Sequence, residues 1–201
     1  MCCSCMFGLP LTHFANSPYD NIMARMFWGL FPLEKAAALS YYEPNTEFSR
    51  VIHAMKYFGR QDVGIHLGEL LARTLQENDF FSDIDVIIPV PLSKERLKER
   101  GYNQTSLVAK GMANITGIAV AEGILERTEF AVSQTHLNIY ERRENVNKAF
   151  RLNDGSRLSG KHLLLIDDVM TTGATLTSCA TQLLTIEDVR ISIATLGFTK
   201  Y

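Results

Sequence analysis

Leu164-Leu-Ile-Asp-Asp-Val-Met-Thr-Thr-Gly-Ala-Thr-Leu176 is the stretch of this 201-residue chain that decides its fold. It begins inside 161–167, whose four central residues are apolar, as is typical of a strand buried on both faces of a parallel sheet. It ends inside 173–184, where apolar residues recur at helical spacing. A buried strand, a short turn and a helix in this order predict an α/β fold that binds its ligand beyond the carboxyl ends of the strands.

The turn between this strand and helix has the composition of a phosphate cradle. Its residues are Thr171, Thr172, Gly173, Ala174 and Thr175. The start of a helix offers unpaired N–H groups and the positive end of a dipole, which suit a phosphate. The glycine lets the backbone approach closely, and the hydroxyls add donors. An ordinary helix start with capping residues is the alternative, and the whole ordered string argues against it.

Two adjacent carboxylates, Asp167 and Asp168, stand just before the cradle, where they would repel a bare phosphate. They make sense as acceptors of hydrogen bonds from the vicinal hydroxyls of a ribose. They could also hold a magnesium ion, directly or through water. Phosphate, diol and metal together predict a ribose 5-phosphate ligand at this site.

Hydrophobic periodicity places the other elements. The expected helices are 21–31, 46–59, 61–76 and 103–115, and the expected strands are 36–42, 84–90, 123–127 and 190–198. The alternation of strands and helices in the second half predicts a parallel sheet with helices on both faces. The polar segment 129–146 shows little periodicity and is predicted to be a mobile loop.

Composition excludes several classes of protein. The chain is 46% hydrophobic and 21% charged, with a formal charge of −2 and a pI of about 6.2, so it lacks a strongly basic nucleic-acid footprint. No apolar run approaches the roughly 20 residues that cross a bilayer, and no signal peptide is recognisable. We expect a cytoplasmic protein without membrane insertion.

The cysteines do not form a disulfide framework. Cys2, Cys3 and Cys5 crowd together, and Cys179 is expected to be a small core residue. Cys2 and Cys5 have the spacing of half a zinc knuckle, but a structural zinc site needs four ligands. His13 could supply a third ligand and the fourth is missing, so the sequence argues against zinc at Cys2 and Cys5.

The stretch 164–176 resembles the phosphoribosyl pyrophosphate (PRPP) signature of type I phosphoribosyltransferases. Further segments resemble the ComF branch of that superfamily, the competence-protein and GntX-like group, and together the match runs from about residue 20 to the C-terminus. These segments are His53-Ala-Met-Lys-Tyr-Phe-Gly59, Asp85-Val-Ile-Ile-Pro-Val-Pro-Leu92, Arg96-Leu-Lys-Glu-Arg-Gly-Tyr-Asn-Gln104, Ser133-Gln-Thr-His-Leu137, Glu141-Arg-Arg-Glu-Asn-Val146 and Ala149-Phe150.

The resemblance implies a type I phosphoribosyltransferase-like fold over 17–201, with a central, mainly parallel sheet flanked by helices and a small N-terminal hood at about 17–60. Residues 1–16 would be the remnant of the zinc ribbon with which ComF-like proteins usually open. The implied activity is a magnesium-dependent phosphoribosyl transfer, in which a nitrogen nucleophile displaces pyrophosphate from the anomeric carbon. Asp167 and Asp168 would bind the ribose hydroxyls, with magnesium as the cofactor. The hood shows no cluster that identifies the acceptor.

Arginines near the site are candidates for the pyrophosphate side. Arg96 and Arg100 follow the strand 86–90 and could neutralise leaving-group charge, although Glu95 and Glu99 alternate with them as on a solvated helix face. Three more candidates lie in the segment that resembles the closing loop of this fold, which could equally be a plain surface loop. They are Gln134, Arg142 and Arg143. Lys56 closes the helix 46–59, where it complements the helix dipole, and is one of the matched residues.

A binding module is the competing hypothesis. The resemblance links the chain to natural competence and DNA uptake, so it could be a non-catalytic adaptor that binds single-stranded DNA or competence proteins. The basic residues of 94–100, with Tyr102, could form part of such a surface, although the mean charge argues against a large one. The expected partners are therefore PRPP or another ribose 5-phosphate compound, single-stranded DNA or competence proteins, and a second copy of the chain.

Overall fold

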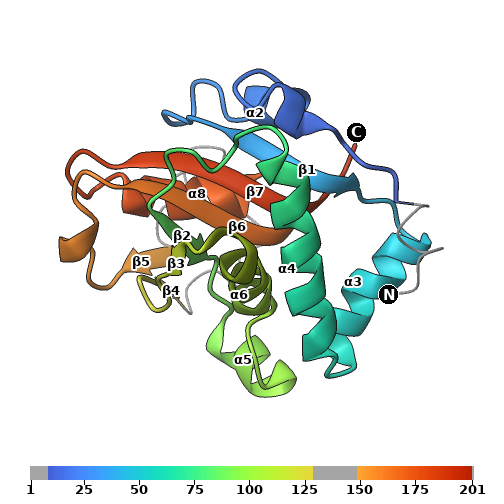
Figure 1. Ribbon diagram of the computed structural model, residues 1–201. Coiled ribbons are helices and arrows are strands. Elements are labelled where there is room, and N and C mark those ends of the chain that lie inside the picture. The colour runs from blue at the N-terminus through green and yellow to red at the C-terminus, as the bar shows by residue number, and fades with distance from the viewer. Residues whose placement is uncertain (1–8, 129–148, 201) are drawn as a thin grey trace, which may run out of the picture.

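The apolar run of the decisive stretch forms the middle strand of a five-stranded sheet in the computed structural model, which describes residues 9–128 and 149–200 (Figure 1). The strand order is β1-β7-β6-β2-β3, and all neighbouring pairs are parallel. The strands are β1 (Ala36–Tyr41), β2 (Val86–Pro89), β3 (Ala119–Val120), β6 (His162–Met170) and β7 (Arg190–Phe198). The predicted α/β class with a parallel sheet is confirmed.

Helices cover both faces of this sheet (Figure 1). α4 (Gln61–Gln76) and α6 (Gln104–Thr116) pack together on one face, and α8 (Ala174–Leu183) packs on the other. Gly68 and Gly111 lie where α4 and α6 meet, and a Cβ on either would collide with the carbonyl group of the opposite helix. Because both faces are covered, residues 163–166 of β6 are fully buried, which explains their uninterrupted apolar sequence.

The remaining elements are short or peripheral. They are the 3₁₀ turns η1 (Phe14–Asn16) and η3 (Ser156–Leu158), and the helices α2 (Ile22–Arg25), α3 (Glu47–Tyr57) and α5 (Lys94–Arg100). The predicted helix 21–31 is wrong beyond Arg25. The Asn21 side chain caps α2 by accepting a hydrogen bond from Ala24 N, but the chain then turns and Gly29 adopts a left-handed φ of 76°.

The segment expected to form the hood, 17–60, contributes β1 to the edge of the sheet and α3 beyond the carboxyl end of that strand. The strand expected at 123–127 forms β4 (Leu125–Arg127), which pairs antiparallel with β5 (Phe150–Leu152) outside the main sheet. The expected loop, 129–146, and the cysteines at 2, 3 and 5 lie outside the described residues.

No helix within 9–128 or 149–200 is long and apolar enough to span a membrane.

Candidate functional site

The predicted phosphate cradle forms the turn between β6 and α8. Its five residues line one small cavity of about 40 Å³ together with Asp167. Gly173 has a left-handed φ of 78°, and a Cβ there would lie 3.0 Å from both Met170 Cε and Phe27 Cε1. The structure therefore requires glycine at this position, and the first residues of α8 line the cavity.

The two aspartates lie within β6 and not after it, because the strand continues to Met170. Successive side chains of a strand point to opposite faces, and the partners of the two carboxyls differ accordingly. Asp168 Oδ2 forms an ion pair with Lys56 Nζ at 2.7 Å, and both side chains are largely buried. Asp167 Oδ1 accepts a hydrogen bond from Asp168 N at 2.8 Å.

The carboxyl of Asp167 is unusually basic. Burial raises its pKa to about 7, and the neighbouring charge of Asp168 adds to the effect. The backbone N–H of Asp168 and the cations of Lys56 and Arg127 act in the opposite direction. At pH 7 the carboxyl of Asp167 is thus about half protonated, and Lys56 is paired with Asp168, so the site is less negative than two bare carboxylates would make it.

Lys56 reaches this site from the last turn of α3. Thr46 caps the start of the helix through Ser49 N, and an apolar face that includes Phe48, Ile52 and Met55 anchors it to the core. The sequence indicated Lys56 through its place in the motif 53–59, but not its partner, because α3 and β6 are more than 100 residues apart.

Arg100 lies at the end of α5, beyond the carboxyl end of β2. Its guanidinium donates to Gln104 Oε1 at 2.9 Å and to the Tyr57 hydroxyl at 3.2 Å, and it stacks over the Tyr57 ring at 4.8 Å. Two buried donors, Arg100 Nε and Gln104 Nε2, have no hydrogen-bond partner within the described part of the chain. Buried donors left unpaired are rare, so these two are candidates to bind an anion.

None of the other predicted pyrophosphate residues is placed at the site within the described part of the chain. Arg96 is exposed on α5. Gln134, Arg142 and Arg143, like Cys2 and Cys5, lie outside the described residues. Arg127 was missed by the sequence reasoning. It ends β4 and lowers the pKa of Asp167 through its charge, and only its position just before the polar segment 129–146 could have singled it out.

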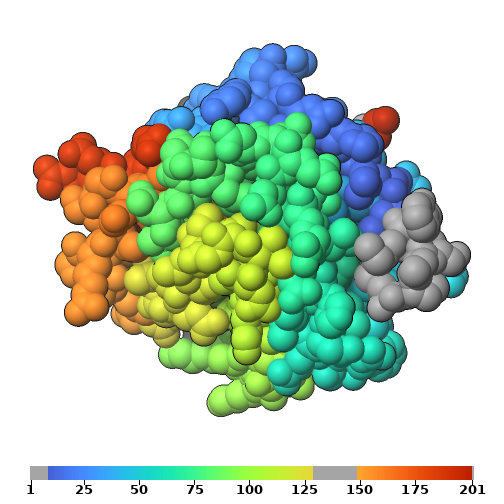
Figure 2. Space-filling view, viewed as in Figure 1, coloured from blue at the N-terminus to red at the C-terminus, as the bar shows by residue number. Residues whose placement is uncertain are grey.

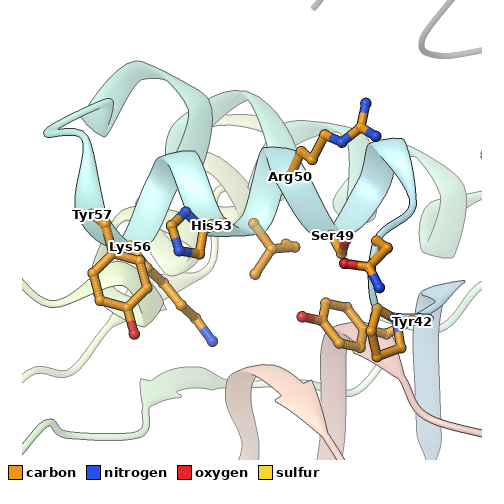
Figure 3. A pocket seen from close by; sticks show the side chains of 9 residues that line it. Tyr42, Ser49, Arg50, His53, Lys56 and Tyr57 are labelled. Carbon is orange, nitrogen blue, oxygen red and sulfur yellow. The ribbon is translucent and has the colours of Figure 1, made fainter.

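A larger pocket of about 420 Å³ lies beside the Lys56–Asp168 pair (Figure 3). We call it the α3 pocket. Its lining residues are Tyr42, Pro44, Asn45, Ser49, Arg50, Ile52, His53, Lys56 and Tyr57. In Figure 3, Lys56 and Tyr57 lie at one end of the hollow and Tyr42 at the other, while Arg50 points away from it. Sequence analysis did not predict this pocket.

Asp167 and Asp168 are the candidate ligands for a magnesium ion. No group of three or more His, Cys, Asp or Glu side chains gathers anywhere in the described ranges. Asp167 and Asp168 are two oxygen donors next to a phosphate cradle, and one of them is already paired with Lys56. Magnesium is commonly bound by one or two carboxylates together with substrate phosphates and waters. The donor set therefore fits a magnesium ion that a phosphorylated ligand brings with it.

No protein-family model matches this chain. It is 30% identical over 156 residues to the DNA utilization protein YhgH of Salmonella typhimurium, across 76% of this chain and 67% of that protein. It is 33% identical over 110 residues to competence protein F of Haemophilus influenzae, across 53% of this chain and 48% of that protein.

Among solved structures, the chain is similar to the glutamine PRPP amidotransferase from B. subtilis complexed with ADP and GMP. The TM-score is 0.47 and the sequence identity is 23%. The likeness covers 71% of this chain and 30% of the amidotransferase chain, so this protein spans about a third of that neighbour's length.

Proposed function

This chain belongs to the ComF family of proteins with the type I phosphoribosyltransferase fold, and from that premise we propose that it binds PRPP at the turn between β6 and α8. The observation that carries the proposal is the single cavity lined by Asp167 and the five cradle residues at the start of α8. The cradle suits the 5-phosphate, and the carboxylates of Asp167 and Asp168 suit the ribose hydroxyls.

The pyrophosphate of the ligand would lie toward α5 and α6. Parallel strands end at the same edge of a sheet, so the segments that follow β2 and β6 meet there. The unpaired donors Arg100 Nε and Gln104 Nε2 support this placement, because an anion would satisfy both. Magnesium, when bound with the ligand through Asp167 and Asp168, would neutralise pyrophosphate charge.

The reaction that this arrangement supports is phosphoribosyl transfer to an acceptor that the site does not identify. A nitrogen nucleophile would form a bond to the anomeric carbon while the bond from that carbon to the pyrophosphate oxygen breaks. The negative charge leaves on pyrophosphate, where Arg100 would stabilise it. Asp168, held by Lys56, would fix the orientation of the sugar during the displacement.

A role in DNA utilization or competence is proposed from the relatives. One relative is named for DNA utilization and matches 76% of this chain, and another is named for competence and matches 53% of it. The chain would then bind a sugar phosphate, or act on one, as part of DNA utilization or competence. Pyrophosphate release in the presence of a nucleophile would identify the transferase activity, and its absence would leave a PRPP-binding protein.

Three small ligands test the binding proposal on the intact chain. Ribose 5-phosphate carries the phosphate and the diol, 2-deoxyribose 5-phosphate lacks one hydroxyl, and inorganic phosphate lacks the sugar. Thermal stability in increasing ligand should rise most with ribose 5-phosphate and about tenfold less effectively with the deoxy sugar, because a buried acceptor is left unpaired. Equal shifts with all three ligands would reduce the site to an anion cradle and refute the assignment of the aspartates.

A further inference from the structure

The last turn of α3 contacts the two groups that were assigned to opposite ends of the ligand. Lys56 Nζ pairs with Asp168 Oδ2 at 2.7 Å, on the side of the sugar. The next residue, Tyr57, accepts a hydrogen bond from Arg100 Nη2 at 3.2 Å, on the side of the pyrophosphate. Figure 3 shows the Lys56 and Tyr57 side chains extending from the same end of the helix. One helical turn therefore meets both halves of the proposed site.

Arg100 is held by neighbouring side chains more than by the packing of its own helix. α5 contributes no buried residue, so contacts with the core do little to fix it. Arg100 Nη1 donates to Gln104 Oε1 at 2.9 Å, and the guanidinium carbon lies 4.8 Å from the centroid of the Tyr57 ring. An arginine side chain that is already held in place loses less conformational freedom when an anion binds it. The stack on Tyr57 therefore favours anion binding at Arg100 without a direct contact between Tyr57 and the anion.

The same contacts determine which donors are left for the anion. Arg100 uses its two terminal nitrogens on Gln104 and Tyr57, and its Nε is a buried donor without a partner in the described part of the chain. Gln104 accepts from Arg100 through Oε1, which leaves its Nε2 as the second such donor. Without Tyr57, the guanidinium could turn away, and the Gln104 amide would lose the contact that fixes its orientation. The two free donors thus depend on the contact between Arg100 and Tyr57.

Tyr57 is suited to this role because its end of the helix is anchored close to Arg100. The Tyr102 hydroxyl donates to Met55 O at 2.6 Å, which ties the last turns of α3 to the segment that follows α5. Tyr102, which the sequence placed in an exposed basic surface, is instead partly buried. The His53 ring lies 4.5 Å from the Tyr57 ring, centroid to centroid. Tyr57 is itself 50% exposed, so replacing it removes its contacts without emptying the core.

We propose that Tyr57 is a positioning residue for the pyrophosphate side of the site, where it orients Arg100 and thereby sets the preference for PRPP over ribose 5-phosphate. This role rests on the proposed function, because it requires the pyrophosphate to bind at Arg100. Lys56 acts at the other end of the ligand, through Asp168 and the sugar. Adjacent residues of one helical turn thus have separable effects. Lys56 affects every sugar-phosphate ligand, and Tyr57 affects only a ligand that carries pyrophosphate.

Titration calorimetry with PRPP and with ribose 5-phosphate, both in the presence of magnesium, measures this preference on the full chain. Tyr57→Leu should bind PRPP about tenfold more weakly and ribose 5-phosphate as tightly as wild type does. Tyr57→Phe keeps the ring and should lose only about threefold. Arg100→Met should also lose the preference, and adding Tyr57→Leu to it should cost nothing further, because Tyr57 acts through Arg100. Phe58→Ala is the matched control and should keep the wild-type preference, since Phe58 is the next residue, is 70% exposed and meets the His53 ring instead.

The role of Tyr57 is refuted by equal weakening of both ligands in Tyr57→Leu, which would mark a structural effect, or by additive losses in the double variant. A preference that is present in the wild type and survives in Tyr57→Leu refutes the role of Tyr57 alone. A wild-type chain that binds neither ligand, or binds PRPP no better than ribose 5-phosphate, refutes the proposed placement of the pyrophosphate and the role of Tyr57 with it. Thermal melting without ligand checks that each variant folds, and Tyr57→Phe and Arg100→Met carry the comparison where Tyr57→Leu does not fold.

Discussion

Lys56 Nζ lies 2.7 Å from Asp168 Oδ2, and this ion pair joins the last turn of α3 to the central strand at the edge where the cradle begins. Both side chains are largely buried, so the pair is screened far less than a surface pair would be. The lysine also lines the α3 pocket. One cation therefore adjoins both the proposed sugar-phosphate site and the α3 pocket.

Replacing Lys56 with methionine should weaken binding of ribose 5-phosphate by about tenfold, because two carboxylates without their cation repel an anionic ligand. Lys56→Arg keeps the charge and should retain most of the affinity. Titration calorimetry without magnesium measures both. Arg60→Met is the control, since Arg60 pairs with Asp62 on the exposed surface. Unchanged affinity in Lys56→Met would contradict the assigned role of the pair.

The raised pKa of Asp167 predicts a pH-dependent affinity. A carboxyl that accepts hydrogen bonds from a diol with both oxygens must be ionised, and burial raises its pKa to about 7. Affinity for ribose 5-phosphate should therefore rise between about pH 6 and about pH 8. Asp167→Asn should abolish this rise, with the phosphate's own titration measured separately on inorganic phosphate as the ligand.

The same raised pKa predicts the effect of Asp167→Asn on stability. The folded state binds a proton at Asp167 that the unfolded state has lost, so this group destabilises the fold as the pH rises from about 4 to about 7. Asn cannot ionise and should raise the melting temperature at about pH 8, with a gain that disappears toward about pH 4. Thermal unfolding across this range provides the measurement, and a gain that grew on acidification would refute the buried-acid account.

Gly173→Ala should disrupt the phosphate cradle. The substitution places a side chain at a φ of 78°, and its Cβ would meet Met170 and Phe27 at 3.0 Å. Gly117→Ala shares the left-handed conformation, with a φ of 72°, but has open space around it. Gly117→Ala should cost about 1 kcal/mol of stability, whereas Gly173→Ala should cost more and also lose phosphate binding. Denaturant unfolding and phosphate titration of both variants separate strain from steric overlap.

A polar cluster around the buried His162, at the amino ends of the strands, predicts a loss of stability in mild acid. His162 is fully buried, contacts Asp83 Oδ2 at 3.1 Å and Ser192 Oγ at 2.8 Å, and lies in a cluster with Lys35 and Arg190. Burial lowers the His162 pKa, although Asp83 opposes the effect. The unfolded state therefore takes up the proton first, and stability should fall as the pH drops below about 6.5. His162→Gln should flatten this dependence, and the exposed His66→Gln should not.

Local pattern was sufficient to predict the central strand, the turn that follows it and the helices α3, α4, α6 and α8. Residues 163–166 are apolar because helices bury both faces of β6, and Thr46 and Asn103 cap helices as their sequence positions indicate. The same reasoning overextended α2, because the apolar spacing of 21–31 continues past the point where the chain turns around the buried Phe27.

Contacts between distant segments could not be predicted in the same way. The sequence places Asp167 and Asp168 side by side, but only tertiary structure shows that Asp168 is ion-paired with Lys56 and that burial raises the pKa of Asp167 while the charge of Arg127 lowers it. The α3 pocket likewise depends on Tyr42 after β1 and Tyr57 at the end of α3 lying across one hollow. No periodicity within either segment specifies how far apart the two rings lie, because their separation is set by how α3 packs against α4.

Calorimetric titration of PRPP with magnesium into the wild-type chain and into the double variant Asp167→Asn/Asp168→Asn is the most direct test of the central claim. The account predicts saturable binding to the wild-type chain and at least a tenfold loss in the double variant, because two acceptors of the ribose hydroxyls are replaced by weaker ones. Equal affinity in both, or negligible heat in both, would contradict it.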